Sequence, residues 1–154
     1  MNEFMKTAIE EAFLAMENNE GGPFGAVIVK DNQIISTAHN EVIKTNDPTA
    51  HAEIVAIRKA ANALGRFDLS DCEIYSSCEP CPMCFAAIHW AKMKKLYYGC
   101  TREDAARIGF DDKYIYDVIS GVASKQQVEV IHLYSDLFIK PFQEWEKKLD
   151  KTQY

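Results

Sequence analysis

The sequence contains no continuous run of the ~18 apolar residues that a membrane-spanning helix requires. Its first residues include Glu3 and lack the pattern of a secretory signal peptide. Internal repeats, low-complexity tracts and a stretch resembling a domain linker are also missing. These absences predict a cytoplasmic protein with no membrane association. The 154 residues are expected to form a single domain that can bury a core without disulfides.

An excess of basic residues is absent as well. The chain has 17 Lys and Arg against 23 Asp and Glu, which gives a formal net charge of -6. Binding of extended nucleic acid depends on neutralising phosphates, so this balance disfavours nucleic acid as a partner. The densest basic stretch, Lys92–Lys95, is interpreted as the solvated end of a helix.

The five cysteines are an odd number, which favours metal ligands or free thiols over a disulfide framework. Three of them follow C-x2-C-x2-C spacing at Cys78, Cys81 and Cys84. An iron–sulfur run would need a fourth cysteine shortly after Cys84, and the next cysteine is Cys100. A structural zinc site would combine all three thiols with His51. Both alternatives compete with a catalytic metal site.

A catalytic zinc site uses these residues more fully. His51, Cys81 and Cys84 would supply three protein ligands and leave the fourth position to water. Two thiolates and a neutral imidazole balance the charge of Zn²⁺. Glu53 would then act as general base and afterwards as general acid, a role that a closed structural site would not give it. We therefore expect one catalytic zinc ion per chain, with Cys78 outside the ligand set.

Hydrophobic periodicity and turn residues predict alternating helices and strands. The helices are expected at residues 3–18, 48–64, 81–92, 101–107, 112–119 and 135–149, the last of them interrupted or begun anew at Pro141. The strands are expected at 25–30, 33–39, 71–77, 95–99 and 127–133, the first two joined by a two-residue turn, and residues 40–46 are expected to be a loop. This order predicts an α/β fold with one mixed five-stranded sheet and helices on both faces.

Asp47 and Pro48 have the residue types of an N-cap and a first helical position. A helix that starts there places His51 and Glu53 in its first turn. Cys81 and Cys84 would lie at the start of the helix after the cysteine motif. Two helix N-termini are therefore expected to converge on the site, where their dipoles favour thiolate over thiol.

The segments His51-Ala52-Glu53 and Pro80–Cys84 (PCPMC) together resemble the signature of zinc deaminases. The sequence is similar to the cytidine deaminase-like superfamily. The resemblance implies a three-layer αβα fold and a reaction in which zinc hydroxide attacks an amidine-type ring carbon and ammonia leaves. It also implies zinc bound by His51, Cys81 and Cys84, with Glu53 transferring protons.

Within that superfamily, the chain resembles the bacterial guanine deaminases over nearly its whole length. The similar segments are GGPFGAVIVKD (21–31), NDPTAHAEIVAIRKA (46–60), SCEPCPMC (77–84) and GFDDKYIY (109–116). This resemblance implies hydrolysis of guanine to xanthine and ammonia in purine catabolism. It further implies a homodimer in which the C-terminal segment, about residues 135–154, crosses to the partner subunit.

The same resemblance assigns residues to the purine. Asn40 would hydrogen-bond it, Phe24 would stack against it with Trp90 nearby, and Asp112 would lie near the departing amino group. Tyr154 would cover the substrate of the partner subunit. Each has a simpler alternative: Asn40 as a turn residue, Asp112 as a helix N-cap, the two aromatics as core residues, and Tyr154 as a frayed end.

Two other functions remain open from the sequence. One is a deaminase of tRNA adenosine or of another nucleoside or base, because the tRNA adenosine deaminases resemble the chain in the same motifs. The absence of a basic tail and the acidic balance set the chain apart from them. The other is a non-enzymatic interaction domain held together by zinc, in which Glu53 would have no function.

Overall fold

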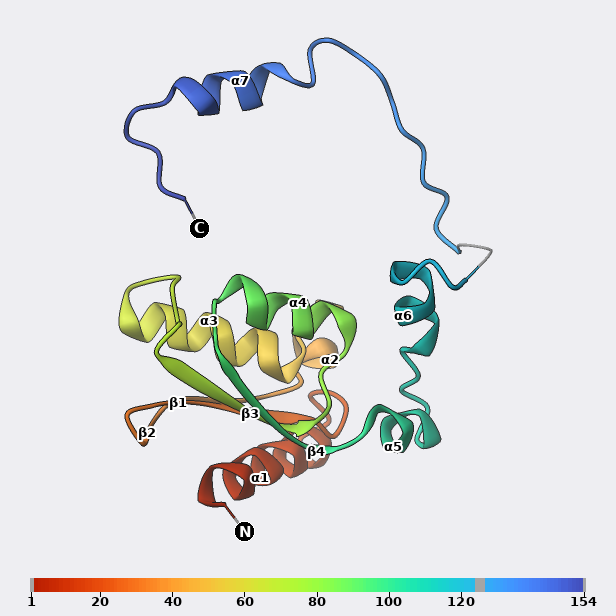
Figure 1. The fold of residues 1–154 in the computed structure, drawn as a ribbon. Coiled ribbons are helices and arrows are strands. Elements are labelled where there is room, and N and C mark those ends of the chain that lie inside the picture. Colours follow the sequence, from red (N-terminus) through yellow and green to blue (C-terminus); the bar gives the residue numbers. More distant parts are fainter. Residues whose placement is uncertain (1, 124–126, 154) are drawn as a thin grey trace.

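The computed structural model describes residues 2–123 and 127–153. Along the chain the elements are α1 (Glu3–Glu17), β1 (Gly25–Lys30), β2 (Gln33–His39), α2 (Val42–Thr45), α3 (Ala52–Leu64), β3 (Cys72–Cys78), α4 (Pro82–Trp90), β4 (Lys95–Cys100), α5 (Arg102–Arg107), α6 (Lys113–Ile119) and α7 (Lys140–Lys147). Figure 1 shows the sheet between α1 on one face and α3 and α4 on the other. The α/β class is confirmed. Across the described residues, every helix is too short or too polar to cross a membrane.

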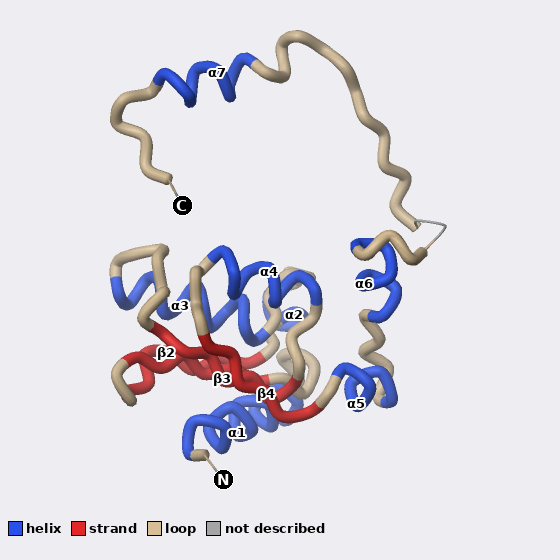
Figure 2. The backbone as a smooth tube through the Cα atoms, in the orientation of Figure 1, coloured by secondary structure: helices blue, strands red, loops and turns tan. Residues whose placement is uncertain are grey.

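The sheet has four strands in the order β2-β1-β3-β4 (Figure 2). β1 pairs antiparallel with both β2 and β3, whereas β3 and β4 are parallel. The hairpin between β1 and β2 turns at Asp31 and Asn32, whose φ angles of 48° and 62° suit a two-residue turn. The parallel pair is joined through α4, so the carboxyl end of β3 leads directly to the amino end of that helix.

Apolar side chains fill both interfaces of the sheet. On the face covered by α3 and α4, Ile28 and Ile74 are fully buried. On the opposite face, Val27 and Val29 are buried with Ala8 of α1. Because β1 is buried on both faces, its sequence is continuously apolar and does not alternate with polar residues.

The helix that follows the 40–46 segment starts later than the sequence predicts. Its first residue is Ala52, and His51 is the N-cap. The Asp47 carboxylate accepts hydrogen bonds from the backbone N–H and the hydroxyl of Thr49, at 2.8 and 2.6 Å. The Asp47 carboxylate is therefore used in a local turn with Thr49, and the helix does not start at Pro48. The predicted loop at 40–46 also contains the short helix α2.

The prediction of a fifth strand at residues 127–133 is wrong. The described sheet ends at β4, and residues 127–133 have no regular structure. Their apolar side chains, Val128, Val130, Ile131 and Leu133, are 67–76% exposed. These residue types favour strands, but a strand forms only where its backbone groups find a partner. Residues 127–153, here called the C-terminal arm, instead lead away from the sheet and carry α7 (Figure 1).

Candidate active site

Both predicted ligand segments lie at the amino end of a helix. His51 is the N-cap of α3, and Cys81 is the N-cap of α4. Cys84 is in the first turn of α4, which begins at Pro82. α3 and α4 lie on the same face of the sheet (Figure 1). The expected convergence of two helix N-termini is thus confirmed, and their dipoles favour negatively charged sulfur at this point.

The three ligand atoms are spaced as a tetrahedral zinc ion requires. His51 Nδ1 lies 3.5 Å from Cys81 Sγ and 3.6 Å from Cys84 Sγ. Zinc bonds of about 2.0–2.3 Å at a tetrahedral angle separate nitrogen and sulfur ligands by about 3.5 Å. The three side chains form one candidate metal group with all ligand atoms within 4.8 Å of one another. Both nitrogen–sulfur distances therefore fit a zinc ion held by these three residues.

The protonation state of Cys81 supports metal binding at this point. Hydrogen bonding from Cys84, aided by His51, lowers the pKa of Cys81 to about 4 against the opposing effect of burial. Cys81 is therefore a thiolate at neutral pH, the form that binds metals. The same contact with Cys81, together with burial, raises the pKa of Cys84.

Cys78 is not part of the ligand group among the described residues. It ends β3, and its thiol contacts the carbonyl oxygen of Thr101 at 3.5 Å. Burial raises the pKa of the Cys78 thiol to about 12, so it stays protonated. The set is thus three-ligand, which leaves one position of a tetrahedral ion for water, as in catalytic zinc sites.

Glu53 is in the first turn of α3, two residues after His51, and only 6% exposed. Its carboxylate accepts a hydrogen bond of 2.9 Å from the hydroxyl of Ser76 on β3. Burial raises the pKa of Glu53, while hydrogen bonds from its own backbone N–H, Ser76 and Cys84 act in the opposite direction. A buried carboxyl group that is held in place by a hydrogen bond from Ser76 is suited to accept and return a proton.

A cavity of about 700 Å³ opens over these residues. This is within the size range of small-molecule sites. Its polar lining comes from the end of β2, from the starts of both ligand helices and from the α5–α6 region, through Asn40, His51, Glu53, Glu79, Cys81, Arg102, Asp111 and Asp112. The structure therefore brings two of the three candidate zinc ligands, His51 and Cys81, to one cavity with Glu53 and two of the predicted purine-binding residues, Asn40 and Phe24.

Asn40 is buried, at 5% exposure, directly after β2. Its side-chain oxygen accepts the backbone N–H of Val42 at 3.1 Å, and its backbone N–H donates to Phe24 at 3.0 Å. The bond from Val42 identifies the oxygen, so the other terminal atom is the NH₂ group. No described residue accepts a hydrogen bond from that NH₂ group. Asn40 is therefore both a local turn residue and a free donor at the cavity wall.

Asp112 lies at the N-cap position of α6, yet its side chain makes no capping bond. Its neighbour Asp111 accepts the backbone N–H of Lys113 at 2.9 Å and fills that role. Burial, and next the charge of Cys81, raise the pKa of Asp112. The carboxyl of Asp112 thus lines the cavity and does not cap the helix.

The predicted aromatic residues are placed differently from one another. Phe24 lines the cavity and packs edge-to-face on Phe110, with ring centroids 5.0 Å apart. Trp90 is the last residue of α4, is 67% exposed, and is not among the described residues that line the cavity of its own chain. Tyr154 lies outside the described residues.

Contacts between α6 and the residue before the ligand Cys81 were not predicted from the sequence. The Tyr116 hydroxyl donates to the carbonyl oxygen of Pro80 at 3.0 Å, directly before the ligand Cys81. The Arg102 guanidinium lies 5.0 Å from the centre of the Tyr116 ring. Tyr116 is four residues after Asp112, so both share one side of α6. That spacing was the only available signal in the sequence.

Comparison with known proteins supports the same chemistry. The chain is 46% identical to "Guanine deaminase" of Bacillus subtilis (strain 168) over 98% of this chain and 97% of that protein. The crystal structure of guanine deaminase from Bacillus subtilis superposes with a TM-score of 0.95, at 46% identity, over 100% of this chain and 99% of that chain. A guanine deaminase from Nitrosomonas europaea has a TM-score of 0.66 at 32% identity, over 71% of this chain and 63% of the other.

A second group of relatives has a different printed activity. The chain is 38% identical to a "tRNA-specific adenosine deaminase" of Agrobacterium fabrum over 83% of this chain and 89% of that protein. The profile of the "Cytidine and deoxycytidylate deaminase zinc-binding region" matches residues 1–100, which contain the whole ligand set. The chain therefore belongs to the zinc-dependent cytidine and deoxycytidylate deaminase family.

Proposed function

We propose that this protein hydrolyses guanine to xanthine and ammonia. The observation that carries the proposal is the ligand group of His51, Cys81 and Cys84 at the wall of a cavity that Glu53, Asn40 and Asp112 also line. Resemblance to guanine deaminase over nearly the full length of both chains supports the choice of guanine. The relatives named as tRNA adenosine deaminases make tRNA adenosine the alternative substrate.

His51, Cys81 and Cys84 would hold the zinc ion. Bound zinc supplies Lewis acidity, which makes water a strong nucleophile near neutral pH. Glu53 takes a proton from the attacking water and returns it to the ring nitrogen beside the reacting carbon. A carbon–oxygen bond forms at C2, the bond from C2 to the exocyclic amino nitrogen breaks, and the amino group leaves as ammonia with the second proton of water.

The other walls of the cavity orient the base. The NH₂ group of Asn40 donates to an acceptor on the purine edge, because its oxygen is already used by Val42. The ring of Phe24, held by Phe110, covers the purine face. Asp112 accepts a hydrogen bond from the amino group that leaves and helps to deliver its proton.

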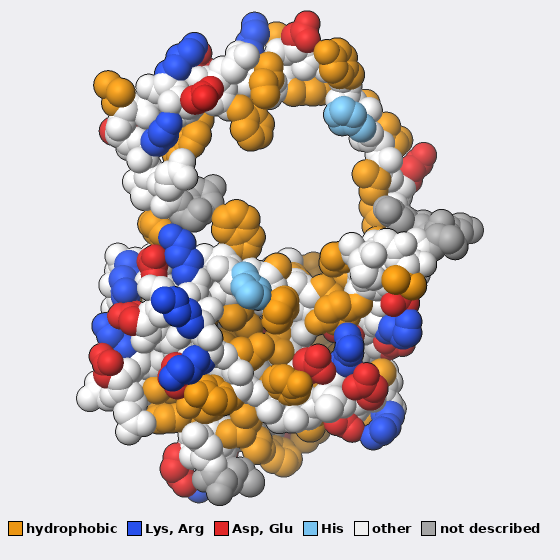
Figure 3. Space-filling model, viewed as in Figure 1, with side chains coloured by type: hydrophobic (Ala, Val, Ile, Leu, Met, Phe, Trp, Pro, Cys, Tyr) orange, Lys and Arg blue, Asp and Glu red, His pale blue; other side chains and the backbone are white. Residues whose placement is uncertain are grey.

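We further propose a homodimer in which the C-terminal arm crosses to the partner subunit and brings Tyr154 over the partner's substrate. In its own chain, the arm leaves Leu137, Phe138, Ile139 and Phe142 exposed. Figure 3 shows hydrophobic side chains along it, apart from the body of the molecule. An apolar segment of this kind is suited to pack on another subunit. Trp90, exposed at the end of α4, retains its proposed place beside a substrate only if the dimer supplies it.

Ammonia release from a panel of purines, pyrimidines, nucleosides and a tRNA anticodon stem-loop tests the substrate. Zinc-loaded protein is expected to turn over guanine and to leave the stem-loop unchanged. Inert guanine together with deamination of the stem-loop would favour the alternative substrate. No turnover of any member of the panel would favour a zinc-stabilised interaction domain.

A further inference from the structure

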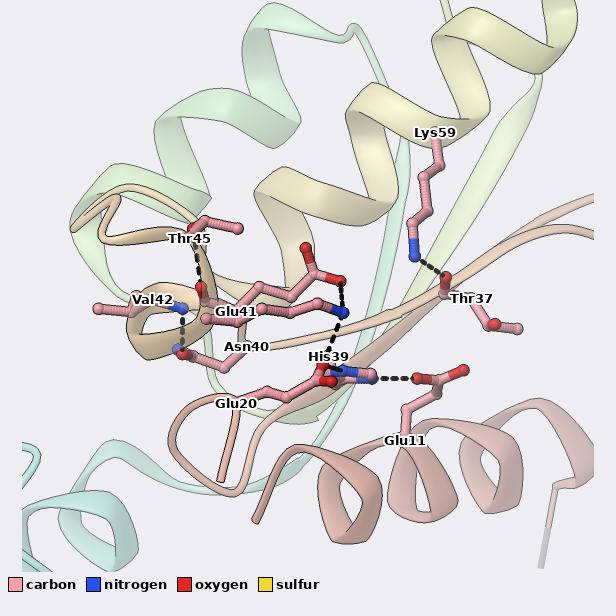
Figure 4. Close-up of polar contacts among 10 residues, drawn as sticks. Glu11, Glu20, Thr37, His39, Asn40, Glu41, Val42, Thr45 and Lys59 are labelled. Atoms are coloured by element: carbon pink, nitrogen blue, oxygen red, sulfur yellow. Dashed lines mark hydrogen bonds and ion pairs between the residues drawn. The ribbon is translucent and has the colours of Figure 1, made fainter. Parts of the chain in front are cut away.

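His39 joins two carboxylates beside the purine cavity, outside the site described above. Its Nδ1 lies 2.6 Å from Glu11 of α1, and its Nε2 lies 2.7 Å from Glu20 in the loop of residues 18–24. Figure 4 shows the ring between these two side chains. Lys44 of α2 approaches the same Glu20 oxygen at 2.9 Å and Glu41 at 3.8 Å. All of these groups except Lys44 are largely buried.

The geometry requires His39 to be an imidazolium. An ionised carboxylate only accepts hydrogen bonds, so both ring nitrogens have to carry a proton to satisfy Glu11 and Glu20. Burial alone would lower the pKa of His39, but the hydrogen bonds that its ring donates to Glu20 and then to Glu11 outweigh burial and raise the pKa. The charge of His39 is therefore present at neutral pH.

Glu20, His39 and Glu41 also meet the spacing of a metal-binding group. The ammonium of Lys44 already supplies positive charge to the two carboxylates. Both nitrogens of His39 are used by carboxylates. The cluster is therefore a charged hydrogen-bond network, and its role is to hold the segments that it connects in place.

Glu20 connects this network to the wall of the cavity. Its carbonyl oxygen accepts the backbone N–H groups of Ile43 and Lys44, both at 3.0 Å, at the start of α2. The next residue, Gly21, packs so closely on Asn40 that a Cβ there would overlap the Asn40 side chain. Gly21, Asn40 and Ile43 all line the cavity.

His39 is also directly bonded in sequence to Asn40. One imidazolium thus attaches the 18–24 loop, α1 and the end of β2 to one another. Glu11 is brought close by Gly25, whose missing side chain admits α1 against β1 at the register position of His39. The position of the Asn40 amide therefore depends on contacts made on the side of β2 away from the zinc ligands.

We propose that charged His39 is a positioning residue for purine binding, acting through Glu20 and the 18–24 loop to hold Asn40 and Gly21 against the base. This inference rests on the proposed function for its substrate. It assigns no chemical step to His39, which is neither one of the zinc ligands nor one of the described residues that line the cavity. Loss of the charge should therefore weaken guanine binding and leave kcat and zinc content unchanged.

The test compares His39→Gln with the wild-type protein. Glutamine is neutral. It also lacks the two opposite N–H groups with which the His39 ring donates to Glu11 and Glu20. At pH 7 the KM of the variant for guanine should be about tenfold higher than that of the wild type, because the variant loses hydrogen bonds between charged groups. His89→Gln, an exposed histidine on α4, is the control and should leave KM unchanged.

The pH dependence of KM separates an effect of the His39 charge from a general loss of structure in the variant. As the pH rises through the raised pKa of His39, the wild type loses the same charge, and the ratio of the two KM values should fall towards one. Using the ratio cancels the titration of guanine itself and of the zinc site, while Glu11, Glu20, Glu41 and Lys44 are common to both proteins. A ratio that stays constant with pH would overturn the role of the charge.

Hydrogen exchange keeps the inference separate from the proposed function. In His39→Gln the amides of Ile43 and Lys44, bonded to Glu20, should exchange about tenfold faster. If wild-type protein leaves guanine unchanged, the proposed function fails, and the exchange result alone then decides whether His39 holds the loop. Unchanged exchange, or faster exchange with an unchanged KM in active protein, would overturn the proposal.

If His39→Gln does not fold, Glu20→Gln is the second variant. It removes the carboxylate charge that His39 Nε2 contacts and carries the same expectations.

Discussion

Replacement of Glu53 by glutamine should separate proton transfer from metal binding. The side chain is the same size, and its amide oxygen accepts the Ser76 hydroxyl as the carboxylate oxygen does at 2.9 Å. The ligand set of His51, Cys81 and Cys84 is untouched. We therefore expect a folded Glu53→Gln variant that retains one zinc ion per chain. It has no group that takes a proton from water.

The magnitude follows from the two roles assigned to Glu53. Loss of one general acid–base group costs about 10²–10⁴-fold in rate, and here one side chain serves as both base and acid. The expected result is a fall in kcat of at least about 10³-fold with little change in KM for guanine. Ammonia release measures turnover, and elemental analysis of the same samples measures zinc.

A matched control is Glu73→Gln. Glu73 lies on the same strand as Ser76 but pairs with Lys95, away from the cavity. This variant should keep wild-type turnover. Zinc loss in Glu53→Gln, or turnover within about tenfold of wild type, would refute the assignment of Glu53 as proton carrier.

Three further predictions follow from the geometry. Removal of zinc by a chelator should abolish activity and leave far-UV circular dichroism unchanged, because the sheet core is separate from the ligands; unfolding on chelation would contradict this. Tyr116→Phe should lower stability by about 1 kcal/mol in urea unfolding and reduce kcat, because the bond to Pro80 is lost; an unchanged kcat would show that this bond does not position Asp112. In an equimolar mixture of inactive Glu53→Gln and Tyr154→Ala chains, a crossing arm should restore about a quarter of wild-type activity, whereas an arm that stays on its own subunit should restore none.

The residues of the metal centre could be predicted from the sequence because they lie in two short segments. The spacing of Cys81 and Cys84, and of His51 and Glu53, is set by the backbone over a few residues. Proline at the start of α4 and the end of β3 just before it are local features as well. The apolar run of β1 likewise indicated a strand buried on both faces.

Features that depend on distant partners could not be read in this way. Residues 127–133 have strand-forming side chains, but no neighbouring strand pairs with them in the described structure. Asp111 and Asp112 are adjacent, have the same chemistry and both line the cavity, yet only packing decided that Asp111 caps α6 and Asp112 does not.

The sequence by itself therefore determined the chemistry of this protein: a three-ligand zinc site with a carboxylate, in a zinc deaminase family. Local spacing is sufficient for that, because His51 and Glu53 lie at one helix start and Cys81 and Cys84 at another. Only the tertiary structure decided how the cavity is built around it. The contacts of His39 with Glu11 and Glu20 and of Tyr116 with Pro80 join residues 19 to 36 positions apart. Side chains that far apart in the sequence meet only after the sheet and its helices have packed.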